Sequence, residues 1–196
     1  MFFLALPLVQ TAFGLSLSET KILLVPVGDI EREVLDVLHK ELAKAFEAVV
    51  IRSSPIALPR EAFNSARGQY SSSFLLNTLR SRRGLGGQEK VLAIADVDLY
   101  ASGLNFVFGE AEFGGRCAVI SLTRLRQGFY ALPENRDLFI ERAKKEAVHE
   151  LGHVFGLEHC PDRFCVMHFS NSLPDTDTKK SAFCPPCQAR LGKLMK

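Results

Sequence analysis

The chain has 196 residues, of which 47% are hydrophobic and 23% are charged, and its formal net charge is +2 at pH 7. This length fits one domain, or one domain with two small lobes, and the apolar fraction is enough for a packed core. The near-neutral charge indicates no special acidic partner. We expect a monomeric protein with no nucleic-acid partner and no membrane partner.

Residues 1–20 form a hydrophobic N-terminal extension whose first 18 residues carry no charged side chain. The apolar run lacks the positive segment of a signal peptide, and Pro7 and Gln10 interrupt it. It is also too short and too broken for a membrane span. A signal, an ordered extension and an upstream start codon remain as alternatives for this segment.

The first part of the fold alternates strands and helices. Compact apolar runs predict strands at Lys21–Val27, 49–51 and 91–97. Apolar residues at helical spacing predict helices over 30–49 and 70–79. The segment 80–87, rich in glycine and arginine, is predicted to be a turn.

The second part begins with a predicted hairpin, in which Gly114 and Gly115 join strands over 104–113 and 116–122. Pro133 and Glu134 then open a long helix. Between the end of this helix and a final helix at residues 185–194, little regular structure is expected. Strands and helices in this order predict an α/β fold with a mixed sheet.

Residues 149–159 read H-E-x-x-H-x-x-G-x-x-H and carry the clearest functional signal. Because His149 and His153 are four residues apart in the predicted helix, both side chains project from one face and can bind one metal ion. Gly156 can end the helix, so that His159 returns from the loop as a third ligand. Three nitrogen ligands with an open fourth position are typical of a catalytic zinc site.

Glu150 follows the first histidine and lies about 100° further around the helix. It can therefore act on a zinc-activated water without binding the metal. It would take the proton of the water that attacks a carbonyl carbon and pass it to the departing amine. The alternative is that Glu150 has no catalytic role and forms an ordinary ion pair with Lys144 or Lys145 on the helix. The chemistry predicted is hydrolysis of a peptide bond.

The five cysteines are an odd number, and four of them occur late in the chain at Cys160, Cys165, Cys184 and Cys187. Their C-x4-C and C-x2-C spacings suit a four-thiolate zinc, which would be structural because its coordination is full. Redox chemistry at the C-x2-C pair and two disulfides remain as alternatives. Reduced thiolates favour zinc and a cytoplasmic location. Cys117, in a predicted strand, is expected to behave as a small hydrophobe.

The zinc-binding helix, the glycine turn, the downstream Met167 and the four cysteines together resemble the archaemetzincins, a branch of the metzincin metallopeptidases. The resemblance extends from Lys21 to the C-terminus, and its specific part is 149–187. The segment 104–109 looks like the family's strand beside the cleft. The gap between Met167 and Cys184 is one residue shorter than in the family pattern, which a loop can absorb.

The resemblance implies a twisted mixed five-stranded sheet with one antiparallel edge strand and a long zinc-binding helix. It implies an upper subdomain over 21–156 and a small irregular lower subdomain over 157–196, within one compact catalytic domain. Met167 would lie in a turn beneath the zinc and support the histidines. Phe169 occupies the position where some metzincins have a tyrosine that touches the metal, so no such switch is expected.

These observations predict a zinc-dependent metallopeptidase with two zinc ions per chain, one catalytic and one structural. An extended peptide or protein substrate would add its backbone to the edge strand near 104–113. Aminopeptidase and endopeptidase action are both compatible with the sequence. The alternative function is a zinc-stabilised peptide-binding protein with little or no hydrolytic activity.

Overall fold

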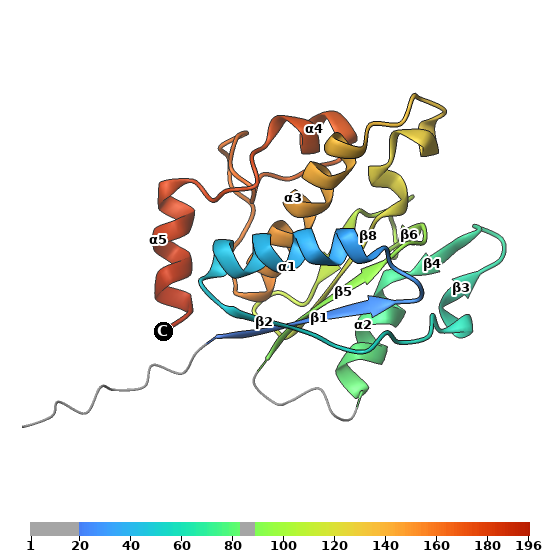
Figure 1. The fold of residues 1–196 in the computed structure, drawn as a ribbon, viewed down its shortest axis with the longest axis horizontal. Coiled ribbons are helices and arrows are strands. Elements are labelled where there is room, and N and C mark those ends of the chain that lie inside the picture. The colour runs from blue at the N-terminus through green and yellow to red at the C-terminus, as the bar shows by residue number, and fades with distance from the viewer. Residues whose placement is uncertain (1–19, 83–88) are drawn as a thin grey trace, which may run out of the picture.

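The computed structural model describes residues 20–82 and 89–196 (Figure 1). The predicted N-terminal extension and most of the predicted turn at 80–87 lie outside these residues. Among the helices of the described part, none has the length and apolar character needed to cross a membrane.

The centre of the fold is a five-stranded sheet with the strand order β2-β1-β5-β8-β7. Four of its strands are parallel, and β7 pairs antiparallel with β8 at one edge. This confirms the predicted α/β fold with a mixed sheet and one antiparallel edge strand. The strands are β1 (Lys21–Val27), β2 (Val49–Arg52), β5 (Lys90–Ala95), β7 (Gly109–Ala111) and β8 (Cys117–Ser121).

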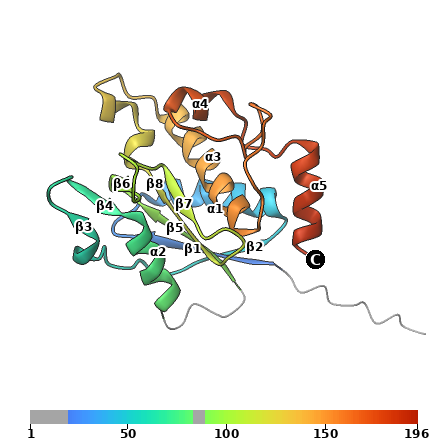
Figure 2. The same cartoon turned by 180° about the vertical axis from the view of Figure 1, so that it is seen from behind.

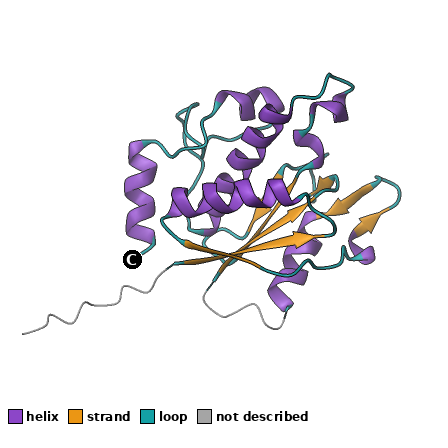
Figure 3. Ribbon diagram, viewed as in Figure 1, coloured by secondary structure: helices purple, strands orange, loops and turns teal. Residues whose placement is uncertain are grey.

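Helices cover both faces of the sheet (Figures 1 to 3). Because side chains alternate along a strand, successive residues of β5 enter different clusters of the core. Leu92 and Ile94 pack with α1 (Arg32–Phe46) and α3 (Arg136–Val154) on one face. Val91, Ala93 and Ala95 pack with α2 (Ser72–Ser81) on the other. The zinc-motif residues therefore lie on a helix anchored directly on the sheet.

A second, three-stranded sheet of order β3-β4-β6 was not predicted from the sequence. It consists of β3 (Phe63–Asn64), β4 (Gln69–Ser71) and β6 (Leu99–Tyr100). Its strands have two or three residues, too few to produce a recognisable alternation. The predicted helix over 70–79 consequently starts later, at Ser72, where the Ser71 hydroxyl caps it by accepting from Phe74 N at 3.3 Å.

The predicted strand over 104–113 is wrong in its first half, because only Gly109–Ala111 pairs in the main sheet. Val107 instead forms an isolated bridge with Leu99 of β6. The Arg67 guanidinium donates hydrogen bonds to the carbonyls of Leu104 and Asn105 at 3.0 and 2.8 Å. These contacts hold the start of the segment toward the small sheet, whereas the Phe108 carbonyl already accepts a hydrogen bond of 2.8 Å from Ser121 N of β8.

The remaining boundaries differ by a few residues. The long helix begins at Arg136, because the Asn135 side chain caps it by accepting from Leu138 N at 3.0 Å. A short helix, α4 (Leu173–Thr178), was missed, whereas α5 (Pro185–Leu194) has its predicted bounds. Short 3-10 turns occupy η1 (Arg60–Ala62), η2 (Thr123–Leu125) and η3 (Gln127–Tyr130).

Candidate metal and catalytic site

The end of α3 brings the three predicted histidine ligands together. The helix ends at Val154, and Gly156 adopts a left-handed conformation with φ of 91°. This conformation suits glycine and reverses the chain, so that His159 faces His149 and His153. The ligand nitrogens of the three rings all lie within 4.8 Å of one another.

Hydrogen bonds fix the orientation of two of these rings. Nδ1 of His149 lies 2.8 Å from the Val166 carbonyl, and Nδ1 of His153 lies 2.8 Å from the Leu157 carbonyl. Because a carbonyl can only accept, each Nδ1 carries the hydrogen, and in a neutral ring each Nε2 then presents a lone pair. The two Nε2 atoms are 3.1 Å apart, and Nε2 of His159 is 3.2 Å from that of His153.

The environment keeps the imidazoles neutral. Burial lowers the pKa of His149 well below its ordinary value, and the positive charge of Lys179 lowers it further. Burial also lowers the pKa of His153 and of His159. Neutral rings whose lone pairs converge repel one another, and a cation between them removes the repulsion. The triad thus has the donor set and orientation of a metal site.

Glu150 is buried beside the histidines and lies against the edge strand. A Cβ atom at Gly109 of β7 would come within 2.6 Å of its Cγ and Oε1. Burial, together with the nearby Glu146 and Glu110 carboxylates, raises the pKa of Glu150 well above its ordinary value. The alternative pairing with Lys144 or Lys145 does not occur in the described structure, where those lysines contact other groups.

Met167 lies fully buried beneath α3. Its sulfur occupies the space over Gly152, where an added Cβ would approach it to 2.3 Å. The Cys160 amide donates to the Met167 carbonyl at 2.9 Å, which ties the methionine turn to the loop that carries His159. Gly109 and Gly152 were not predicted as site residues, because a sequence gives no sign of which glycine another element approaches.

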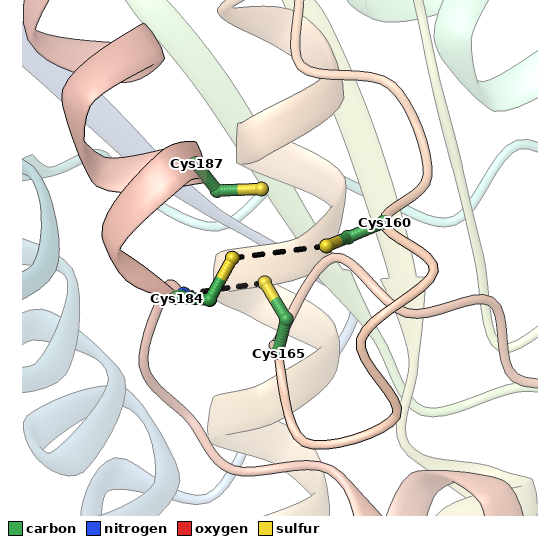
Figure 4. Close-up of side chains that lie close together, drawn as sticks. All are labelled: Cys160, Cys165, Cys184 and Cys187. Carbon is green, nitrogen blue, oxygen red and sulfur yellow. Dashed lines mark hydrogen bonds between the residues drawn. The ribbon is translucent and has the colours of Figure 1, made fainter.

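The four predicted cysteines also converge. Cys160 and Cys165 come from the loop after α3, while Cys184 and Cys187 lie at the start of α5, and their sulfurs point toward one another (Figure 4). All four sulfurs lie within 4.8 Å, and those of Cys160 and Cys184 are 3.7 Å apart. All four are free thiols. Cys117 is also free, and burial in β8 raises its pKa to about 11.

A cleft with a cavity volume of about 220 Å³ opens over the histidines and Glu150. The segment before β7 forms one wall, and residues after the methionine turn form the other. The lining residues are Leu104, Phe106, Val107, Phe108, Gly109, Glu146, His149, Glu150, His153, His159, Phe169, Ser170 and Asn171.

A buried ion pair beside the cleft was missed by sequence reasoning. Lys179 Nζ lies 3.0 Å from Glu146 Oε1, with side chains 0% and 3% exposed. The Thr176 hydroxyl donates to the same oxygen at 3.2 Å. One turn earlier on α3, Arg142 donates two hydrogen bonds of 2.7 Å to Asp177. These contacts attach α4 to the zinc-motif helix, although α4 has no apolar periodicity that would reveal it.

Comparison with known proteins agrees with this geometry. The model of Peptidase family M54 matches residues 18–193. A protein named Archaemetzincin from Methanocaldococcus jannaschii is 45% identical over 171 residues, which cover 87% of this chain and 92% of that protein. The Archaemetzincin from Pyrococcus furiosus is 44% identical over 175 residues, covering 87% and 91%.

Solved structures are similar over the same length. The crystal structure of Archaemetzincin from Methanopyrus kandleri superposes with a TM-score of 0.79 at 39% identity, covering 90% of this chain and 95% of that one. A zinc-dependent peptidase from Methanocorpusculum labreanum has a TM-score of 0.77 at 28% identity, covering 87% and 99%.

Proposed function

The chain belongs to peptidase family M54, and we propose that it hydrolyses peptide bonds with a zinc ion held by His149, His153 and His159 and with Glu150 as general base. Family membership makes it a zinc metallopeptidase. The roles of the individual residues, the number of zinc ions and the position of cleavage are our proposal.

The observation that carries the proposal is the pair of facing lone pairs on His149 and His153. Their Nε2 atoms are 3.1 Å apart while each Nδ1 donates to a carbonyl. Tetrahedral zinc with Zn–N bonds of about 2.0–2.1 Å requires nitrogens roughly 3.3–3.4 Å apart. The observed spacing fits a zinc ion with little adjustment, and three neutral nitrogens leave a coordination position for water or substrate.

When bound, zinc lowers the pKa of a coordinated water and polarises the scissile carbonyl. Glu150 accepts the proton of the attacking water and delivers it to the departing amine. Its place in the helix supports this role, because Glu150 is buried directly after the ligand His149 and lines the same cleft as the three histidines. Gly109 supports it too, since only a residue without a side chain leaves room for the carboxylate.

The second proposed metal is a structural zinc held by Cys160, Cys165, Cys184 and Cys187. Four thiolates fill a tetrahedral zinc and leave no place for substrate. Because Cys160 follows His159 directly, this zinc would fix the loop that carries the third catalytic ligand. The free thiols support zinc over the disulfide alternative.

The substrate would bind as an extended chain beside β7. This strand is the last in the sheet order, and β8 pairs with only one of its edges. Antiparallel pairing is slightly more stable per residue than parallel pairing. An antiparallel substrate would place the residues on the C-terminal side of the scissile bond along the segment 104–108.

The rival function is a zinc-stabilised protein that binds peptides without cleaving them. The retained Glu150 and its contact with Gly109 favour hydrolysis, because binding alone has no use for a buried carboxylate beside the histidines.

A peptide-library digest analysed by mass spectrometry separates these functions. Zinc-loaded protein should release defined products, and their termini give the position of cleavage. Chelated protein and the His153→Ala variant should release no products. Adding zinc back should restore activity to the chelated protein but not to the variant. A fully zinc-loaded protein that binds library peptides yet releases no product would establish the rival.

A further inference from the structure

A row of stacked side chains leads from the cleft to the η3 turn. The ring of Phe106, which lines the cleft, lies 4.3 Å from the guanidinium carbon of Arg124. The same guanidinium carbon lies 4.6 Å from the centroid of the Phe129 ring. The Phe129 ring in turn contacts Tyr130 edge-on at 5.0 Å. We call Phe106, Arg124, Phe129 and Tyr130 the aromatic row.

The aromatic row is held in place before any ligand binds. Asp98 accepts two hydrogen bonds from Arg124, of 2.5 and 2.8 Å. Such a two-point contact fixes the plane of the guanidinium, so the rings that stack on it have defined positions. A preformed surface loses less conformational entropy on binding than a mobile one.

The aromatic row leaves large apolar surfaces in water. Phe129 is 43% exposed and Tyr130 is 39% exposed. Leu132 beyond the turn and Leu104 at the cleft are 52% and 54% exposed. A single exposed apolar side chain is ordinary, but a connected series indicates a binding surface. Phe129 and Tyr130 form such a series, because their rings connect through Arg124 to Phe106, which lines the cleft beside Leu104.

We propose that the aromatic row is a docking surface for the substrate polypeptide on the C-terminal side of the scissile bond. The inference rests on the proposed function, because it takes the cleft to be the site of cleavage and the substrate to run antiparallel to β7. In that direction the chain would pass the segment 104–108, where Phe106 contacts Arg124 and Arg124 contacts Phe129.

Charge and size define what the aromatic row selects. Asp98 neutralises Arg124, so the surface has no net charge with which to attract an acidic segment. The exposed parts of the Phe129 and Tyr130 rings favour aromatic or large aliphatic side chains. Successive groups are 4.3 to 5.0 Å apart. The row therefore spans at most about 14 Å. At about 3.3 Å per residue, this length corresponds to roughly four residues of extended chain.

Peptide binding to the zinc-loaded Glu150→Ala protein tests this without requiring cleavage. Two fluorescent peptides of equal length share one core sequence. One extends the core by six residues with phenylalanines at its C-terminal side, and the other carries the same extension at its N-terminal side. Fluorescence anisotropy should give a Kd about five- to tenfold lower for the first peptide, as expected for burying one or two half-exposed rings.

Adding Phe129→Ala and Tyr130→Ala to this protein should raise the Kd of the C-terminally extended peptide to that of the other peptide. The Kd of the N-terminally extended peptide should stay unchanged. That unchanged Kd would also show that the fold is intact. Ile51→Ala is the matched control, since Ile51 is 41% exposed on β2 at the opposite edge of the sheet. Equal Kd values for the two peptides, or an advantage that survives the double substitution, would overturn the inference. If the parent protein, which retains Glu150, cleaved neither peptide, that result would count against the proposed hydrolysis but not against the docking surface.

Discussion

Replacing Gly109 with alanine should reduce catalysis while preserving the fold and the metal. The new Cβ would stand 2.6 Å from Cγ and Oε1 of Glu150 and 2.7 Å from its Cδ. Ordinary contacts between such atoms are about 3.5–4.0 Å. The carboxylate must therefore move by about 1 Å.

A displacement of about 1 Å at a catalytic group costs on the order of 100-fold in rate. We expect kcat to fall by about that factor, with little change in KM, since Glu150 acts on the water and does not hold the substrate. The free energy of unfolding should change by less than about 1 kcal/mol. Alanine is favoured over glycine in a strand by roughly 0.5–1 kcal/mol, and this gain offsets part of the cost of moving the carboxylate.

Steady-state kinetics on a peptide that the parent cleaves, with zinc content and Tm measured in parallel, would check this prediction. Gly192→Ala in α5 is the control, because its added Cβ meets no atom within 4 Å. It should keep full activity. A Gly109→Ala protein with more than half the parental kcat would refute the proposed dependence of catalysis on the Gly109–Glu150 contact.

Three further predictions concern the surroundings of the site. Cys165→Ser should lower Tm and weaken zinc binding at the histidines, because metal-binding energy at a structural site is folding energy; unchanged Tm and activity would exclude a structural zinc there. Lys179→Met should cost about 3–5 kcal/mol in urea unfolding, because it leaves the Glu146 carboxylate buried without its partner; a loss below about 1 kcal/mol would contradict a buried pair. In metal-free protein, Glu150→Gln should gain stability over the parent as pH rises above 4.5, the ordinary pKa of glutamate. The folded parent holds its proton above that pH while the unfolded chain releases it, so parental stability falls with rising pH; urea unfolding from pH 5 to 8 should show the difference widening, and a constant difference would contradict the raised pKa.

The part of the site that the sequence predicts is the part that local geometry determines. The four-residue spacing of His149 and His153 places both on one helix face whatever surrounds the helix. The glycine turn and the spacing within each cysteine pair likewise act within a few residues, whereas the convergence of the two pairs joins the loop after α3 to the start of α5. The strongest strands and helices were predicted because their apolar pattern extends over several residues, as a continuous run in β1 and as helical spacing in α1.

The parts that were missed depend on contacts between distant segments. Glu146 and Lys179 are 33 positions apart, and their pairing follows from the packing of α4 on α3. The approach of Gly109 to Glu150 similarly depends on how α3 crosses the edge strand. The segment before β7 has the composition of a strand, but hydrogen bonds from Arg67 hold it toward the small sheet. No local pattern contains this information.

The central claim is that Glu150 performs proton transfer beside a zinc ion that the three histidines hold. Bound zinc and kcat/KM, determined on the same preparations of the parent and of Glu150→Ala, test it most directly. The account predicts two zinc ions per chain in both proteins and a loss of at least about 1,000-fold in kcat/KM in the variant. A variant that keeps most of its activity, or one that loses activity only because it has lost its zinc, would contradict the claim.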